Sequence, residues 1–258
     1  MPVSPADPVA PRRLTRADRP ALAWRATGGS GPTIVFLPGY ASDMRGSKAV
    51  ALFDWAAARG QSSVLFDYAG CGASGGDFAD QTLTDWRDDA LAIVDRLTTG
   101  PVLLVGSSMG GWLMLLVALA RPERIAAIVG IAAAPDFTDW GYSDADKAAL
   151  VRDGQLSQDN RYGPDATLTS LALWQSGQAH RLLDAPIALD CPAVLLHGQA
   201  DTDVPFAISL RLADRLRSAA VRTVLVKDGD HRLSRPQDIA LLLSALDTLI
   251  ADLESPRQ

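Results

Sequence analysis

Short apolar runs alternate with longer amphipathic stretches along most of the chain. The runs are rich in Val, Ile, Leu and Ala and occupy residues 33–37, 62–66, 101–105, 125–131, 192–197 and 222–226. Runs that are apolar throughout are typical of parallel strands covered on both faces. Helical periodicity fills the stretches between them, at residues 46–59, 82–98, 109–121, 206–219 and 236–253. This α/β alternation predicts a doubly wound, mostly parallel sheet with helices on both faces.

One long segment interrupts this rhythm. Residues 136–190 contain no clear strand but several aromatic side chains. Within them, "DADKAAL" and "TLTSLALWQSGQAHRLL" have the pattern of helices. An insertion of this length between two strands of a sheet often serves as a lid over a binding site. We therefore expect a helical cap at about residues 136–190.

Composition and charge restrict the classes of partner. The 258 residues are 48% hydrophobic and 21% charged, a balance typical of a globular protein. The formal net charge of −6 disfavours nucleic acid or an anionic membrane as partner, because both attract clustered Lys and Arg. The arginines that do cluster, at positions 12, 13, 16 and 19, lie in a Pro-rich N-terminus. We interpret residues 1–20 as a flexible tail.

Cysteine usage and the N-terminus bear on location. Cys71 and Cys191 are far apart in the chain and predict neither a disulfide framework nor a Cys-rich metal site. Reduced thiols of this kind are typical of cytosolic proteins. The first 20 residues lack the apolar core of a signal peptide and resemble no transit peptide, and no apolar stretch is long enough to span a membrane. We expect a cytoplasmic protein, with its oligomeric state left open.

The strongest chemical motif lies between the third apolar run and the helix that follows it. Residues 106–110 read Gly-Ser-Ser-Met-Gly, which fits G-x-S-x-G with Ser108 at its centre. In a sharp turn from strand to helix, small neighbours allow the strained serine backbone that exposes the hydroxyl. The strand before and the helix after this motif favour Ser108 as a nucleophile over a simple packing joint, with Ser107 as its support.

A serine nucleophile needs a base, and the chain contains three histidines. His180 falls in the expected cap, where it is exposed or lines a pocket. His197 ends an apolar run, a position that favours a structural role. His231 follows the last predicted strand, in the loop "KDGDHRLS", from which a base could reach the sheet edge. We therefore assign His231 as the base.

Two aspartates compete for the role of the acid that orients the base. Asp201 and Asp203 both lie in "HGQADTDVP", the loop after a predicted strand. Asp203 stands next to Val204-Pro205, where a carboxylate would favour the start of the next helix. We favour Asp201, which gives the order Ser108, Asp201, His231 along the chain.

Backbone groups near Ser108 could stabilise a developing oxyanion. The first predicted strand is followed by "PGYAS", so the N–H of Tyr40 could point at the reacting carbonyl. Met109 follows the nucleophile at the start of a helix, where N–H groups are free to bind an anion. We expect these two N–H groups to form an oxyanion hole.

Five blocks of the sequence together resemble a known family. They are "FLPGYASDMRGSKA", "FDYAGCGASGGDF", "LVGSSMGGWLM", "LLHGQADTDVP" and "DHRLSRPQDI", and they extend from about Ile34 to Leu253. The chain resembles the α/β-hydrolase superfamily, and within it the subgroup that includes a mitochondrial palmitoyl-protein thioesterase, also described as an acyl-glucuronide esterase. The resemblance implies an α/β-hydrolase domain over residues 21–258. It also implies the roles given above for Ser108, Asp201, His231, Tyr40 and Met109.

The expected function is that of a serine hydrolase that cleaves carboxylic esters or acyl thioesters through an acyl-enzyme. Its partner would be a small-molecule or acylated substrate, with no metal and no organic cofactor. Phe137, Trp140 and Trp174 could line an apolar acyl pocket, or they could pack the underside of the cap. A proline-releasing aminopeptidase stays open as an alternative, with Asp136 and Asp139 as candidate amine anchors. A binding module without catalysis is a further alternative, which the intact Ser, His and Asp argue against.

Overall fold

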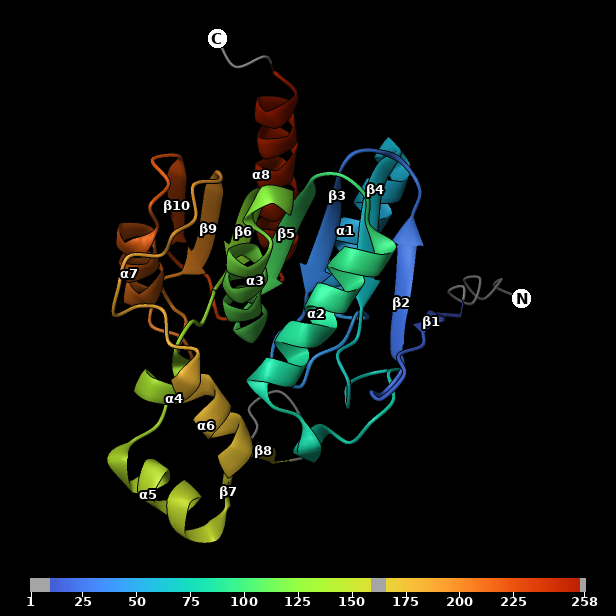
Figure 1. The fold of residues 1–258 in the computed structure, drawn as a ribbon. Coiled ribbons are helices and arrows are strands. Elements are labelled where there is room, and N and C mark those ends of the chain that lie inside the picture. The colour runs from blue at the N-terminus through green and yellow to red at the C-terminus, as the bar shows by residue number, and fades with distance from the viewer. Residues whose placement is uncertain (1–9, 159–165, 256–258) are drawn as a thin grey trace, which may run out of the picture.

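The computed structural model describes residues 10–158 and 166–255 (Figure 1). Its centre is an eight-stranded sheet in the order β1-β2-β4-β3-β5-β6-β9-β10. These strands are β1 (Arg12–Leu14), β2 (Leu22–Thr27), β3 (Ser30–Leu37), β4 (Gln61–Phe66), β5 (Val102–Ser107), β6 (Ile125–Ile131), β9 (Ala193–Gly198) and β10 (Val221–Val226). From β4 to β10 every neighbouring pair is parallel. The predicted α/β fold with a mostly parallel sheet is thus confirmed.

The N-terminal edge of the sheet corrects the prediction of a flexible tail. β1 pairs antiparallel with β2, which pairs antiparallel with β4. The buried guanidinium of Arg16 donates to the carboxylate of Asp89 and to the carbonyl of Pro20. The prediction is therefore wrong for residues 12–20, and residues 1–9 lie outside the described part. The sequence concealed these strands because edge strands are half exposed and lack a continuous apolar run.

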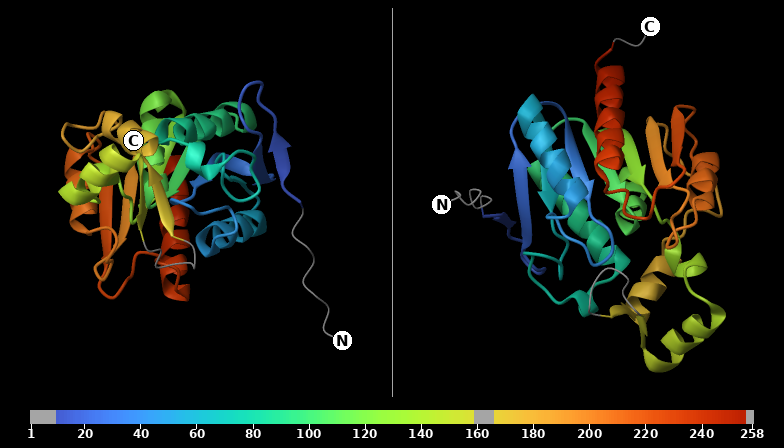
Figure 2. Two further views of the ribbon diagram at one scale, coloured as in Figure 1. Left: turned by 90° about the horizontal axis from the view of Figure 1, so that it is seen from below. Right: turned by 180° about the vertical axis from the view of Figure 1, so that it is seen from behind.

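Helices cover both faces of the sheet (Figures 1 and 2). One face carries α1 (Ser47–Arg59) and α8 (Pro236–Glu254), and the other carries α2 (Leu83–Leu97), α3 (Met109–Ala120) and α7 (Ala207–Arg215). Two short turns of 3-10 helix complete this part, η1 (Phe78–Asp80) and η2 (Pro122–Arg124). α2 begins at a reciprocal capping box between Thr82 and Asp85, and α1 ends at Gly60 with left-handed backbone (φ 63°). Within the described residues, no helix has the length and apolar character that crossing a membrane requires.

The cap lies at the carboxyl edge of the parallel strands, at the bottom of Figure 1. It consists of α4 (Phe137–Trp140), α5 (Asp144–Asp153), the antiparallel pair β7 (Gln155–Gln158) and β8 (Thr167–Ser170), and α6 (Leu171–Ala179). The expected absence of strands is wrong for β7 and β8, and α6 is shorter than the helix expected there. The residues of β7 and β8 are mostly polar, so they show no apolar pattern from which a strand could be predicted. Cross-strand hydrogen bonds hold this ribbon together. The cap boundaries at 136 and 190 stay a prediction.

A change in chain direction at the centre of the sheet positions the functional loops. The chain passes from β3 to β4 on one side and then returns to β5 on the other side of β3. Loops leaving the carboxyl ends of β3 and β5 therefore diverge, and α/β proteins bind ligands at such a crevice. Tyr40 lies on the first of these loops and Ser108 on the second.

Candidate active site

Ser108 occupies a strained turn between β5 and α3. Its backbone has φ 54° and ψ −121°, a region that non-glycine residues rarely adopt. The flanking glycines are required sterically. A Cβ on Gly106 would lie 2.4 Å from the carbonyl oxygen of Gly110, and a Cβ on Gly110 would lie 2.1 Å from that of Leu37. The G-x-S-x-G pattern therefore reflects the crowding that forces the serine outward.

A chain of hydrogen bonds joins three side chains from distant parts of the sequence. The Nε2 atom of His231 lies 3.1 Å from the Oγ atom of Ser108, and its Nδ1 atom lies 2.8 Å from the Oδ2 atom of Asp201. Ser108 follows β5, Asp201 follows β9 and His231 follows β10. Each residue thus lies at the carboxyl end of its strand, where the parallel sheet brings distant loops together. The structure unites the three residues that the sequence singled out.

Asp201 is held as a carboxylate by donors on both oxygens. Its side chain is completely buried. Oδ1 accepts the backbone N–H groups of Asp203 (2.8 Å) and Val204 (2.9 Å). Burial alone would raise the pKa of Asp201, but hydrogen bonds from His197 and His231 and the Val204 N–H hold that pKa well below its ordinary value. Asp201 is therefore ionised at neutral pH.

Asp203, the competing acid, also lies at the site. One of its carboxylate oxygens falls within 4.8 Å of the corresponding ligand atoms of Asp201 and His231. It lines the cavity beside Ser108, whereas the acceptor of the hydrogen bond from Nδ1 of His231 is Asp201. Among the described residues, these three form the group of acidic and histidine side chains close enough to share a metal ion. Two of the three are already bonded to each other.

His197 is the residue whose contacts the sequence did not reveal. It is fully buried, and its Nε2 atom lies 3.1 Å from Oδ2 of Asp201 and 2.9 Å from the carbonyl oxygen of Val204. Its Nδ1 atom lies 2.6 Å from the hydroxyl of Ser209. The i, i+4 spacing to Asp201 was a possible signal, but the bend of the loop after β9 decides whether such residues meet.

The loop after β3 approaches Ser108 from the opposite side. A Cβ on Gly39 would lie 3.4 Å from the Cβ of Ser108, so this loop passes directly beside the turn. Tyr40 follows on the same loop, and Met109 begins α3. The ring of Tyr40 packs edge-on against Phe78, and its hydroxyl donates to the carbonyl of Leu168 in β8. The two backbone groups expected to bind an oxyanion thus flank Ser108, and Tyr40 also links its loop to the cap.

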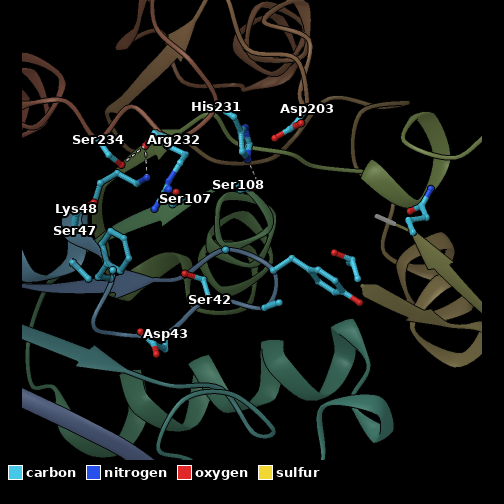
Figure 3. A pocket seen from close by; sticks show the side chains of 18 residues that line it. Ser42, Asp43, Ser47, Lys48, Ser107, Ser108, Asp203, His231, Arg232 and Ser234 are labelled. Carbon is cyan, nitrogen blue, oxygen red and sulfur yellow. Dashed lines mark hydrogen bonds between the residues drawn. The ribbon is translucent and has the colours of Figure 1, made fainter. Parts of the chain in front are cut away.

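A cavity of about 490 Å³ opens beside the Ser108–His231 pair (Figure 3). Its lining combines a few apolar residues with many polar ones. The polar side chains come from Ser42, Asp43, Ser47, Lys48, Ser107, Gln158, Thr167, Asp203, Arg232 and Ser234. Such a lining provides donors and acceptors for a polar group beside apolar surface from residues such as Phe36 and Ala49.

Lys48 brings a titratable cation to this cavity. Its ammonium donates to the carbonyl of Arg232, which also accepts from the hydroxyl of Ser234 (3.0 Å; Figure 3). Burial, and then repulsion from the Arg232 guanidinium, lowers the pKa of Lys48 to about 8. The positive charge of this side chain therefore changes near physiological pH.

The aromatic residues expected to line an acyl pocket lie elsewhere. None of Phe137, Trp140 and Trp174 belongs to the described residues that line the cavity. Phe137 packs edge-on against Trp112 of α3, with ring centroids 5.5 Å apart. The indole N–H groups of Trp140 and Trp174 donate to carbonyls of residues 135 and 138. Phe137 and Trp140 pack against the core, as in the alternative that the sequence left open, and the assignment of the three residues to an acyl pocket stays a prediction.

The candidate amine anchors are also engaged in structural contacts. The buried carboxylate of Asp136 accepts the backbone N–H groups of residues 182 and 183, both at 2.8 Å. Asp139 pairs with Arg181 at 3.3 Å and with Lys147 at 3.8 Å. Neither aspartate lines the cavity in the described part of the chain. This arrangement gives no support to an aminopeptidase.

His180 belongs to a contact between the cap and α2. Its Nε2 atom lies 2.9 Å from the hydroxyl of Thr84, which lies 2.8 Å from that of Ser176 in α6. Burial lowers the pKa of His180, with a further contribution from Arg87. This histidine therefore holds cap helix α6 against α2 and does not reach Ser108.

Comparisons with known proteins agree with this architecture. The model of the alpha/beta hydrolase family matches residues 34–241. The chain is 39% identical to the palmitoyl-protein thioesterase ABHD10, mitochondrial, of Homo sapiens, over 94% of this chain and 80% of that protein. The structure of alpha/beta hydrolase domain-containing protein 10 from mouse has a TM-score of 0.90 and 39% identity, covering 95% of this chain and all (100%) of that one.

A bacterial structure is similarly close. A putative hydrolase from Agrobacterium vitis S4 has a TM-score of 0.88 and 36% identity, covering 95% of this chain and 100% of that one. The curated relatives from human and mouse are named mitochondrial. These names contradict the cytoplasmic location expected from thiol usage and the N-terminus, and that prediction is wrong. Reduced thiols occur in more than one compartment, so two unpaired cysteines do not specify a location.

Proposed function

Because this chain belongs to the alpha/beta hydrolase family, we propose that Ser108, His231 and Asp201 are the catalytic triad of its reaction. The enzyme is a serine hydrolase that acts on esters or thioesters. The observation that carries the proposal is the pair of hydrogen bonds at His231, 3.1 Å to Ser108 Oγ and 2.8 Å to Asp201 Oδ2. In this arrangement a neutral imidazole can accept the serine proton while a fixed carboxylate stabilises its charge.

The first half of the reaction forms an acyl-enzyme. Oγ of Ser108 attacks the carbonyl carbon while Nε2 of His231 takes the hydroxyl proton. The negative charge then resides on the former carbonyl oxygen, where the N–H groups of Tyr40 and Met109 stabilise it. Collapse of this intermediate breaks the bond to the alcohol or thiol, which receives the proton from His231. Ser108 is left carrying the acyl group.

The second half returns the enzyme to its starting state. A water molecule gives a proton to Nε2 of His231 as its oxygen attacks the acyl carbon. The intermediate collapses, the carboxylic acid departs, and Oγ of Ser108 recovers its proton from His231. Throughout, Asp201 keeps Nδ1 of His231 protonated and remains ionised, in keeping with its lowered pKa. No step uses a metal ion or an organic cofactor.

The cavity accepts the leaving group in this proposal. Lys48, Asp203 and several serine hydroxyls line it beside the Ser108–His231 pair, so an alcohol or thiol that carries polar groups is matched there. Because His231 must protonate the leaving group, that group has to lie on the His231 side of the site. The relatives named palmitoyl-protein thioesterase are consistent with a leaving group that is part of a larger polar molecule.

A fluorophosphonate probe tests the role of Ser108. Labelling of the wild-type enzyme and its absence in folded Ser108→Ala are expected, with Ser107→Ala as the matched control that keeps labelling. Equal labelling of Ser108→Ala and the wild type would refute the assignment.

A substrate series then defines the preference of the enzyme. Nitrophenyl esters and acyl thioesters of graded chain length separate esterase from thioesterase activity by kcat/KM. For a fixed acyl group, esters of polyhydroxylated or charged alcohols are expected to have a lower KM than esters of alkyl alcohols. The reverse order would contradict the assignment of the cavity to the leaving group.

A further inference from the structure

The buried histidine beside the triad acid has no role in the reaction described so far. His197 comes from the end of β9, and every polar atom of its ring has a partner. We propose that His197 is a positioning residue that fixes the orientation and limits the basicity of the Asp201 carboxylate. This inference rests on the proposed function of the triad, because it concerns how Asp201 serves His231.

The protonation of the His197 ring follows from its partners. Nε2 lies 3.1 Å from the carboxylate of Asp201 and 2.9 Å from the carbonyl oxygen of Val204, and both of these accept hydrogen bonds. Nε2 must therefore carry a hydrogen. In the neutral ring Nδ1 then accepts, and Ser209 donates to it at 2.6 Å. The acceptors at Nε2 thus select the tautomer that donates to Asp201, and Ser209 of α7 satisfies the other ring nitrogen.

Two imidazoles share one carboxylate oxygen as a result. Oδ2 of Asp201 accepts from Nδ1 of His231 at 2.8 Å and from Nε2 of His197 at 3.1 Å. Oδ1 is held by two backbone N–H groups at 2.8 Å and 2.9 Å. With four donors around it, the carboxylate cannot rotate without losing bonds that are buried and expensive to break. His231 therefore meets an acceptor in a fixed place.

The second donor also alters the charge that His231 experiences. A hydrogen bond from His197 withdraws electron density from Oδ2 and weakens the attraction of that oxygen for the imidazolium form of His231. With this donor removed, Asp201 would bind the imidazolium more strongly. His231 would then stay protonated to higher pH, and a protonated His231 cannot act as a base. The acid limb of the pH–rate profile would move upward.

The charged groups around the triad are the background for this effect. They are Asp203 and Asp230 from the loops that carry the triad, Lys48 and Arg232 at the cavity, and Arg211 and Arg215 on α7. The α7 arginines donate to the carbonyl of Leu183, away from His197. Asp230 accepts from the backbone of Leu233. A substitution at His197 leaves all these groups in the chain, so a shift of the profile reports the lost donor.

Two substitutions at the same position test the proposal. His197→Leu removes the donor, whereas His197→Gln places an amide nitrogen near the former Nε2. In full-length enzyme with a nitrophenyl ester, His197→Leu is expected to lower kcat about tenfold, as expected for the loss of one hydrogen bond to a charged group. Its acid limb should move up by roughly half a pH unit. His197→Gln should recover much of the lost kcat and return the acid limb most of the way to its wild-type position. A folded His197→Leu with the wild-type acid limb would overturn the proposal.

Ser209→Ala keeps the test decisive if His197→Leu does not fold. Loss of this hydroxyl leaves Nδ1 of His197 without its donor and loosens the ring that donates to Asp201, so a smaller shift of the acid limb in the same direction is expected. The ¹⁵N shifts of the three histidines in wild-type enzyme provide an independent test. A His197 that is protonated on Nδ1 and bare on Nε2 would refute the proposal. Activity in Ser108→Ala would instead refute the triad itself, which separates the two failures.

Discussion

Replacing the triad acid by its amide should abolish the base function of His231 without changing the shape of the site. In Asp201→Asn one carboxylate oxygen becomes an NH₂ group. The Oδ1 position faces two backbone N–H groups, which can only donate, so the amide oxygen must occupy it. The NH₂ group therefore takes the Oδ2 position and points a hydrogen at Nδ1 of His231, while Nε2 of His197 keeps the Val204 carbonyl as its acceptor. His231 is forced to accept at Nδ1 and to carry its proton on Nε2.

With its proton on Nε2, the imidazole of His231 has no lone pair facing the serine hydroxyl. It therefore cannot accept the serine proton. The tautomer that results is the wrong one for general-base catalysis, and the loss expected for such a change is about 10⁴-fold in kcat. This loss corresponds to about 5.4 kcal/mol of activation free energy. The assay is steady-state hydrolysis of a nitrophenyl ester at pH 7.5, with melting temperature and circular dichroism to verify folding. KM should change little, because the cavity lining is intact.

Asp203→Asn is the matched control. Asp203 lines the cavity, whereas the acceptor of the Nδ1 hydrogen bond of His231 is Asp201, so the Asp203 amide should retain most of the activity. A loss of less than tenfold in Asp201→Asn, or a larger loss in Asp203→Asn, would refute the reasoning about the tautomer.

The Asp201→Asn substitution should also change how the stability of the protein depends on pH. The pKa of Asp201 is lower in the folded state than in the unfolded chain, where it is about 4. A depressed pKa of this kind contributes stability above pH 4, and the contribution disappears as the pH falls through the folded-state pKa. The difference in free energy of unfolding between wild type and Asp201→Asn should therefore be full at pH 7 and shrink on acidification below pH 4. Urea unfolding at several pH values measures it.

Other parts of the site give further predictions. Gly110→Ala would place a Cβ 2.1 Å from a main-chain oxygen of the β3 segment, so we expect a lower melting temperature and loss of fluorophosphonate labelling. Gly28→Ala, whose Cβ would meet nothing within 4 Å, should retain both. For an ester with an anionic leaving group, KM should rise as the pH passes about 8, because Lys48 loses its charge there. If KM of a Lys48→Met enzyme still rises at that pH, Lys48 is not the cause. Tyr40→Phe and Tyr142→Phe each remove one hydroxyl contact to β8 and should each cost about 1 kcal/mol in urea unfolding. Only Tyr40→Phe should also lower kcat, since Tyr40 lies on the proposed oxyanion loop, and equal kcat values would count against that loop.

The central strands of the sheet could be predicted from the sequence, whereas the strand at its N-terminal edge and the strands of the cap could not. Most residues of β3, β4, β5, β6 and β9 are buried, so the composition of these strands alone marks them as apolar runs. β1 and the β7–β8 pair are short and partly exposed, and main-chain pairing with the neighbouring strand holds them without an apolar run. The arginines near the N-terminus read as a solvated cluster. The buried pair between Arg16 and Asp89 shows that one of them has a fixed partner 73 residues away.

The candidate site divides in a similar way. The glycines around Ser108 meet a local steric requirement. Because that requirement involves consecutive residues, it can be recognised from the sequence. Phe137, Trp140 and Trp174 gave no such information, because an aromatic side chain is equally suited to a pocket wall and to packing beneath a cap. The structural role predicted for His197 left its partners unspecified for the same reason: burial at the end of a strand says nothing about which polar group a side chain meets there.

By itself the sequence determined the parallel sheet, the strained serine turn and the order of Ser108, Asp201 and His231. These features depend on periodicity, local sterics and the position of loops after strands, all of which are properties of neighbouring residues. Only the tertiary structure decided that Asp201 accepts the hydrogen bond from Nδ1 of His231, that His197 shares the same carboxylate oxygen, and which side chains line the cavity. Those outcomes depend on distances of a few ångströms between loops that are far apart in the chain. The packing of the sheet sets such distances, and no single segment encodes them.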